Sequence, residues 1–182
     1  NPVTDVLSAK FSPDGKYIVT ASDDRTARLW NLDGQLLTKF KGHQGWLNSV
    51  QFSPDGKYIV TAADDHTARL WNLNGQLLAE LKGHRNIVNS AQFNPDGKYI
   101  VSASADGTAR VWNLNGQLLA DLKGHQNWVT NAHFSPDSQT IITASSDGTA
   151  RLWSIQGQLL TEFKGHQKGV SIAQFSRDGK YI

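Results

Sequence analysis

The feature that most constrains this chain is a repeat with a period of 41 residues. The motif Phe-x-Pro-Asp-Gly-Lys or a close variant of it opens every copy, and a Trp and a His recur at the same spacing. The repeated residues are Phe11, Phe52, Phe93, Phe134 and Phe175, then Trp30, Trp71, Trp112 and Trp153, then His43, His84, His125 and His166. A fixed period indicates one structural unit used several times, so what is inferred for one copy applies to the others.

Each copy has the pattern of four short strands. In the copy that starts at Gly42, strands are predicted over residues 46–53, 57–63, 67–73 and 76–82, because apolar and β-branched residues alternate there with polar ones. Turn residues such as Pro-Asp-Gly and Asn-Gly separate the strands. A period of about 40–45 residues with four strands per copy indicates a β-propeller blade. The predicted fold is therefore all-β, a β-propeller of four-stranded antiparallel blades.

The 182 residues divide into four complete repeats and a partial fifth, at about 1–41, 42–82, 83–123, 124–164 and 165–182. A blade has two apolar faces and buries them by stacking radially against its neighbours. The set predicted to pack blade against blade is Val50, Phe52, Ile59, Ala62, Leu70, Trp71, Leu77 and Leu78. Propellers have four to eight blades. We therefore expect this segment to be part of a larger ring, closed by further blades of a longer chain or of other copies.

The composition of the chain narrows the classes of site, location and partner that it can have. The chain has no Cys, which excludes disulfides and thiolate metal sites and favours a reducing, cytoplasmic location. No apolar run approaches the roughly 20 residues that cross a bilayer, so no membrane association is predicted. A net charge of +2 does not favour a nucleic-acid partner. The repeated Arg28, Arg69, Arg110 and Arg151 are expected on a solvated surface that spreads charge around the ring.

With Gly-His at one end of each copy and Trp-Asn or Trp-Ser near the other, the chain resembles the WD-repeat β-propeller family. The near-identity of the copies is similar to WD-repeat arrays of bacterial, especially cyanobacterial, proteins. In that family a His, a Ser or Thr, an Asp and a Trp join in a hydrogen-bonded tetrad within each blade. The resemblance implies structural tetrads at His43, Thr61, Asp65 and Trp71, at His84, Ser102, Asp106 and Trp112, and at His125, Thr143, Asp147 and Trp153. The first copy has Pro2 in the place of the His, and His166 belongs to the incomplete copy.

A hydroxyl, an imidazole and a carboxylate together also suggest a hydrolase site. A catalytic nucleophile needs one exposed position and an oxyanion hole, whereas this set recurs in every complete copy and ends in an indole. Repetition is expected of a scaffold. The same His residues show no metal-binding spacing. We therefore predict no catalytic residue, no enzyme activity, no metal and no cofactor.

The copies differ mainly in two clusters. One covers residues 44–47 and their equivalents, before the first strand of each copy, and the other covers residues 64–66 and their equivalents, between the second and third strands. In an up-and-down blade both connections fall at the same end of the propeller, where variable loops carry function. Trp and Arg dominate binding energy at interfaces. The candidate binding rim consists of Trp46, Ile87, Trp128, Arg25, His66, Arg85 and Lys168.

Three functions stay open at this point. The first is a non-catalytic scaffold that presents this rim to a protein or peptide. The second is binding of a small ligand or glycan at the rim or in the central channel. The third is a recently amplified array without a settled function, in which Trp46 and Trp128 only cover the ends of strands.

Overall fold

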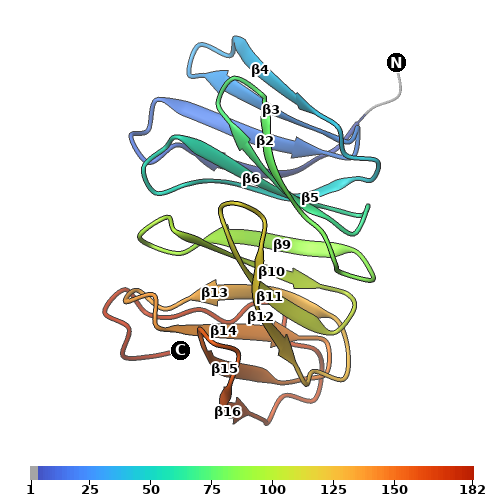
Figure 1. Ribbon diagram of the computed structural model, residues 1–182, viewed down its shortest axis with the longest axis vertical. Coiled ribbons are helices and arrows are strands. Elements are labelled where there is room, and N and C mark those ends of the chain that lie inside the picture. The colour runs from blue at the N-terminus through green and yellow to red at the C-terminus, as the bar shows by residue number, and fades with distance from the viewer. Residues whose placement is uncertain (1–3) are drawn as a thin grey trace.

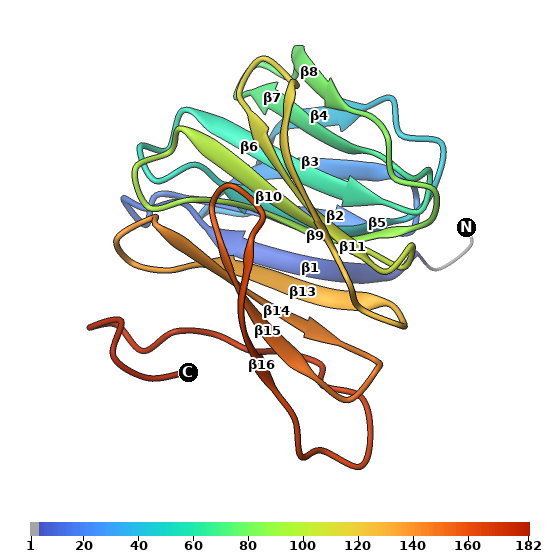
Figure 2. The ribbon, with the colours of Figure 1, turned by 60° about the horizontal axis from the view of Figure 1, so that its bottom comes forward.

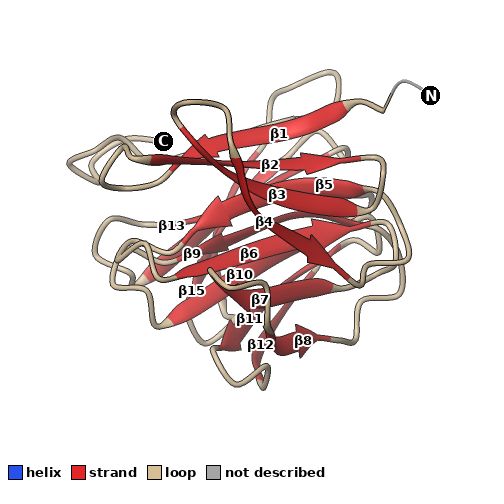
Figure 3. Ribbon diagram, turned by 90° about the horizontal axis from the view of Figure 1, so that it is seen from above, coloured by secondary structure: helices blue, strands red, loops and turns tan. Residues whose placement is uncertain are grey.

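The computed structural model describes residues 4–182, and in this range it contains strands, turns and loops but no helix (Figures 1 and 3). Its sixteen strands form four antiparallel sheets in which the strands follow one another in chain order. The all-β prediction and the four-stranded blades are confirmed. Because these residues form no helix, none of them belongs to a helix that could span a membrane.

The first two sheets consist of β1 (Val6–Phe11), β2 (Tyr17–Ser22), β3 (Thr26–Asn31) and β4 (Leu36–Lys41), and of β5 (Leu47–Phe52), β6 (Tyr58–Ala63), β7 (Ala68–Asn72) and β8 (Leu77–Leu81). The last two consist of β9 (Val88–Phe93), β10 (Tyr99–Ser104), β11 (Thr108–Asn113) and β12 (Leu118–Lys123), and of β13 (Val129–Phe134), β14 (Thr140–Ser145), β15 (Ala150–Ser154) and β16 (Leu159–Phe163). The strands of the second sheet lie within one residue of their predicted bounds.

The inner strands β1, β5, β9 and β13 gather at the centre of the molecule (Figure 2). Side chains near the start of the inner strands β5 and β9 tie each of them to the next blade. Asn48 donates to the Val88 carbonyl at 3.1 Å, and Asn89 donates to the Val129 carbonyl at 2.8 Å. The same bond recurs from blade to blade because the residues that make it recur, which fixes how adjacent blades sit.

Apolar side chains fill the space between adjacent blades. Phe40 on β4 packs edge-on against Trp71 of the next blade, with ring centroids 5.9 Å apart, and only 2 % of Phe40 is exposed. Leu81 and Leu122 take the equivalent positions and are fully buried. Phe163 is the fourth equivalent, and 40 % of it is exposed because no described blade covers it. The burial of this position therefore depends on the presence of a following blade.

One part of the predicted packing set is wrong. Leu77 and Leu78, on the outermost strand β8, are 45 % and 47 % exposed. The pairing of β7 with β8 shifts register at this point, and Ala79 and Leu81 face the neighbouring blade instead. The outer strands β4, β12 and β16 begin with the same exposed leucine pair.

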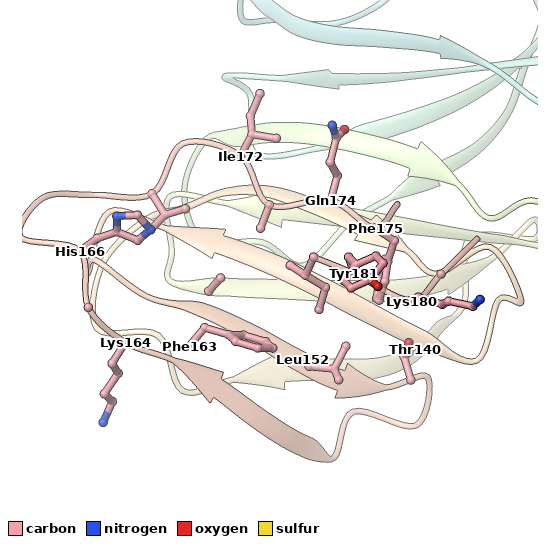
Figure 4. Close-up of a pocket in the computed structure, with 16 residues that line it drawn as sticks. Thr140, Leu152, Phe163, Lys164, His166, Ile172, Gln174, Phe175, Lys180 and Tyr181 are labelled. Carbon is pink, nitrogen blue, oxygen red and sulfur yellow. The ribbon is translucent and has the colours of Figure 1, made fainter. Parts of the chain in front are cut away.

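The four sheets do not close into a ring. Residues 165–182 form no strand and cross the face of the last sheet that points away from the other three sheets (Figure 4). A cavity of about 1040 Å³ lies between this segment and the sheet, with Leu152 and Phe163 on one side and Ile172 and Tyr181 on the other. At the opposite end Phe11 is 65 % exposed, although its equivalent Phe52 is 6 % exposed. Both ends of the array thus present apolar surface.

Candidate functional site: buried tetrads and a variable rim

In the second blade the structure brings His43, Thr61, Asp65 and Trp71 together. His43 Nδ1 lies 2.8 Å from Asp65 Oδ2, and His43 Nε2 lies 2.8 Å from the Thr61 hydroxyl. Trp71 Nε1 donates to the same hydroxyl at 2.9 Å. The imidazole therefore links the loop before β5 to β6, β7 and the turn between them.

The direction of these hydrogen bonds follows from the acceptor-only carboxylate. The Asp65 carboxylate cannot donate, so His43 Nδ1 carries a proton and donates to it, and Nε2 accepts in the tautomer that has its proton on Nδ1. The Thr61 hydroxyl therefore donates to Nε2 and accepts the indole proton of Trp71. Each polar side-chain atom of this tetrad has at least one partner, as buried polar groups require.

The third and fourth blades repeat this geometry. His84 lies 2.9 Å from Asp106 and 2.7 Å from Ser102, and Trp112 donates to Ser102 at 2.8 Å. The fourth blade has the corresponding distances of 2.8, 2.7 and 2.9 Å among His125, Asp147, Thr143 and Trp153.

The first blade retains only part of the network. Trp30 donates to Thr20 at 2.9 Å, and Asp24 accepts from Arg28 and Thr26. Pro2, which the sequence places at the position of the His, lies outside the described residues. His166 belongs to the incomplete copy and is exposed. Among the described blades, the complete tetrad is therefore found in the second, third and fourth.

The carboxylates of the tetrads are held in the charged form. Burial raises the pKa of Asp65, but hydrogen bonds from His43, Thr67 and the Gln44 backbone outweigh burial and leave this pKa well below its usual range. The pKa values of Asp106 and Asp147 are lowered against burial by equivalent bonds. These donors favour the ionised carboxylate, and no acid form remains near neutral pH.

The fourth imidazole is held neutral. Burial lowers the pKa of His125 below its usual value, and the hydrogen bond from this ring to Asp147 does not fully compensate. A neutral ring is the form that the hydrogen-bond directions of the tetrad require.

The tetrad hydroxyls are sealed from solvent. Thr61, Ser102 and Thr143 are 0 % exposed, and each hydroxyl is fully engaged with an indole and an imidazole. A buried hydroxyl with both bonds used has no path to a substrate, so this geometry gives no support to nucleophilic chemistry. Residues 4–182 also hold no group of three or more His, Asp or Glu side chains placed to bind a metal ion.

Sequence reasoning missed the role of the third-strand arginines. Arg110 and Arg151 are each 9 % exposed, so the expected solvated surface is wrong for them. Arg69 donates to Glu80 on the adjacent strand at 2.9 Å, and its guanidinium lies against Gly42. A Cβ at Gly42 would meet Arg69 Nη1 at 2.6 Å. The repeated Gly before each His is the signal that could have revealed this contact.

The rim residues lie at one end of the blades. The Trp46 carbonyl accepts from the Asp64 amide at 2.9 Å, so the loop before β5 touches the turn between β6 and β7. The Ile87 and Trp128 carbonyls accept in the same way, each at 2.9 Å. In the fourth blade, Gly148 in the turn between β14 and β15 lies close to the backbone of Lys168, in the loop after β16. Loops and turns therefore alternate along one continuous rim.

The side chains of the rim are open to solvent. Trp46 and Trp128 are 55 % and 54 % exposed, and Ile87 is half-buried. The four cationic or titratable rim positions are exposed, namely Arg25, His66, Arg85 and Lys168. The two indoles therefore contribute little to the interior.

Two rim residues adopt a left-handed backbone. Arg25 has φ of 66° and His66 has φ of 67°, whereas Gly107 and Gly148 hold the equivalent turn positions in the later blades. A left-handed conformation disfavours residues with a Cβ. The first two blades thus carry a long side chain where glycine would fit the turn better.

Two models of known protein families match this chain. Residues 49–182 match the family model described as IFT122 first beta-propeller, and residues 1–31 match the model described as WD domain, G-beta repeat. The chain belongs to the WD-repeat β-propeller family. The first match alone spans most of the chain, and the period, the strand order and the buried His, Asp and Trp residues agree with this assignment.

Two curated relatives come from Arabidopsis thaliana. The Notchless protein homolog is 58 % identical over 36 residues, which are 19 % of this chain and 8 % of that protein. The target of rapamycin complex subunit LST8-1 is 48 % identical over 42 residues, which are 22 % of this chain and 14 % of that protein. The matched segments thus span a small part of either relative. Both are plant proteins, so the similarity to bacterial arrays stays a prediction.

Proposed function

We propose that this chain is a non-catalytic WD-repeat scaffold that binds a protein or peptide on its variable rim. The exposure of Trp46 and Trp128 is the observation that carries the proposal. An indole offers a large apolar surface with few rotatable bonds, and Trp residues are enriched among the residues that dominate binding energy. The indoles that hold the fold together are the buried ones, which leaves these two for contacts with a partner.

The strained turns support the same proposal. Replacing His66 or Arg25 by glycine would relieve the backbone, and the later blades have glycine there. A residue that persists in a sparsely populated conformation points to a role for its side chain. Both side chains are exposed at the rim. The rim therefore combines aromatic anchors with cationic and imidazole groups, a composition typical of interfaces.

The relatives are consistent with protein partners. The name of one relative describes a subunit of the target of rapamycin complex. For this chain the partner is proposed by chemistry alone, as a peptide or protein segment with apolar side chains that the two indoles cover. A cytoplasmic location and an origin in a bacterial array form part of the proposal.

The test is a comparison of three purified forms of the protein as bait. The native form should retain a set of partners that the double variant Trp46→Ala, Trp128→Ala loses, while its Tm changes by no more than about 2 °C because neither residue is buried. The control variant Leu118→Ala, Leu119→Ala removes apolar side chains that are 46 % and 50 % exposed on the outer strand, away from the rim. Equal capture by all three forms would refute rim binding.

A small-ligand site in the central channel is the second candidate. A cavity of about 480 Å³ lies among the inner strands, and Ser90 in its wall is 5 % exposed, with no hydrogen-bond partner for its hydroxyl within residues 4–182. Burial, together with the positive charge of Lys10, lowers the pKa of His133 in the same wall. Such a lining suits an uncharged polar ligand such as a glycan. Retention on a carbohydrate array that Ser90→Ala abolishes would favour this function over the first.

We also propose that further blades cover the two apolar ends of the array. Phe163 is exposed where Phe40, Leu81 and Leu122 are buried, and Phe11 is exposed where Phe52 is buried. Apolar area removed from water stabilises by roughly 25 cal/mol per Å². The additional blades would come from a longer chain or from a second copy. Light scattering separates these possibilities, because association with a second copy raises the measured mass as the protein concentration rises.

A further inference from the structure

In the second and fourth blades the third-strand Arg bonds an acidic residue on the fourth strand, whereas Arg28 of the first blade faces Lys39 there and pairs with Asp24. Arg69 pairs with Glu80 across β7 and β8, and Arg69 Nη2 donates to Glu80 at 2.9 Å. Arg151 donates to Glu162 through Nε at 3.1 Å and through Nη2 at 2.7 Å. Such a charge-assisted bond satisfies a guanidinium that the fold has largely removed from water.

The third blade departs from this pattern. Asp121 stands where the other two blades have Glu80 and Glu162, and its side chain is one methylene shorter. Arg110 Nε lies 3.4 Å from Asp121 Oδ1, and neither atom has a hydrogen-bond partner among the described residues. Arg110 is 9 % exposed. Arg110 is therefore ion-paired with Asp121 but donates no hydrogen bond within the described residues. Arg69 Nε also lacks a partner there, but Arg69 Nη2 is bonded to Glu80. The donors of Arg110 thus stay available to an added acceptor.

A cavity of about 130 Å³ lies beside this guanidinium. Its lining consists of Arg85, Asp106, Thr108, Arg110 and Lys123. It has about four times the share of volume that a water molecule takes in the liquid. Arg85 is specific to this blade, because the equivalent position is Val in the first copy, at residue 3, and Gln in the others, at residues 44, 126 and 167.

The one carboxylate in the lining is already saturated. Asp106 Oδ2 accepts from His84 Nδ1 and from the Arg85 amide, both at 2.9 Å. Its Oδ1 accepts from the amide and the hydroxyl of Thr108, at 2.9 and 2.7 Å. Asp121, at the edge of the site, is bonded to Lys123 through its other oxygen at 2.9 Å. Three cationic side chains thus line a space whose own carboxylate, Asp106, is saturated, with Asp121 Oδ1 3.4 Å from Arg110 Nε beside it.

We propose that this cavity binds a phosphate group, either as the free anion or as a phosphomonoester carried by a peptide side chain. A guanidinium presents paired donors in the geometry of a phosphate, and Arg110 is held in place by burial. Arg85 and Lys123 line the same cavity and are exposed, so they supply two further positive charges. The site shares Arg85 with the rim but contains neither indole, so substitution of the indoles and titration with phosphate test the two proposals separately.

The experiment is a calorimetric titration of the purified protein with inorganic phosphate at low ionic strength, where surface charges are least screened. We expect one site per chain. Arg85→Gln, which installs the residue of the second, fourth and fifth copies, should weaken binding about tenfold or more, since a charge-assisted hydrogen bond is worth that much. Asp121→Glu should weaken binding to a similar extent, because the longer carboxylate would satisfy Arg110 as Glu162 satisfies Arg151.

A transplant provides the matched gain-of-function control. In the Asp121→Glu background, the fourth-blade changes Gln126→Arg and Glu162→Asp should restore phosphate binding. A phosphoserine peptide that binds at least about tenfold more tightly than inorganic phosphate would identify a protein-borne group, and equal affinities would identify the free anion. Failure of the native protein to bind phosphate, or unchanged binding by Asp121→Glu, would overturn the proposal. Partner capture is measured separately, so failure of the rim proposal leaves this result unaffected.

Discussion

Replacing Thr61 by Val tests the tetrad most sharply, because it removes one hydroxyl and keeps the shape of the side chain. In the native structure that hydroxyl accepts from Trp71 at 2.9 Å and bonds His43 Nε2 at 2.8 Å. Thr61, Trp71 and His43 are 0 %, 2 % and 5 % exposed, so water cannot replace the lost partner. Two buried polar atoms that lose a partner cost about 1–3 kcal/mol each, and we expect a loss of about 2–5 kcal/mol in the free energy of unfolding.

The first blade offers a matched control. Thr20 holds the equivalent position, but the described contacts of its side chain are limited to Trp30 at 2.9 Å, and Trp30 is only half-buried. Thr20→Val should therefore cost about 0.5–1 kcal/mol, the value of one ordinary hydrogen bond. Thr61→Ser retains the hydroxyl, as Ser102 does in the third blade, and should lose much less than Thr61→Val.

Urea unfolding followed by far-UV circular dichroism measures these differences, with the slope of the transition checked for each variant. Equal losses for Thr61→Val and Thr20→Val would refute the reasoning, because the argument depends on two orphaned buried atoms against one hydrated atom. A loss below about 0.5 kcal/mol for Thr61→Val would do the same.

Three further predictions follow from the same contacts. Because the pKa of His125 is lowered in the folded protein, stability should begin to fall as the pH drops through the unfolded value of about 6.5. The tetrad Asp residues should add a second loss below about pH 4, as the pH falls toward their lowered pKa values. Both losses should be visible in a plot of Tm against pH. Gly42→Ala should reduce Tm more than Gly165→Ala, since both glycines have positive φ but only Gly42 has a guanidinium against the added Cβ. His66→Gly should raise stability by up to about 1 kcal/mol through relief of its left-handed backbone and should weaken partner capture; a stability loss would contradict the strain argument.

The strands could be predicted from sequence because each is bounded by residues with one structural use. In the turn after β5, Gly56 has φ of 71°, and the Ser53 hydroxyl bonds both Asp55 and the amide of Tyr58. Ser, Asp and Gly at those offsets specify the turn, and the repeat confirms the pattern several times over. The residues of the tetrads could be named in advance because the chain resembles the WD-repeat family at these positions in every complete copy.

The exposed leucine pairs and the buried arginines could not be predicted in the same way. Two adjacent leucines such as Leu77 and Leu78 break the alternation that assigns a side chain to one face, and the register shift that exposes both arises from pairing with β7. Arg151 is buried because a partner on the next strand neutralises it, and a strand-to-strand contact of this kind depends on register. Tertiary pairing, which no single segment encodes, decided both outcomes.

The most direct measurement of the central claim is hydrogen exchange at the six indole N–H groups, resolved by ¹H–¹⁵N NMR. The account predicts slow exchange for Trp71, Trp112 and Trp153, whose indole protons are buried and bonded to hydroxyls, and fast exchange for Trp46 and Trp128. Protected indoles at Trp46 and Trp128, or unprotected ones in the tetrads, would contradict the division between a sealed interior and an accessible rim.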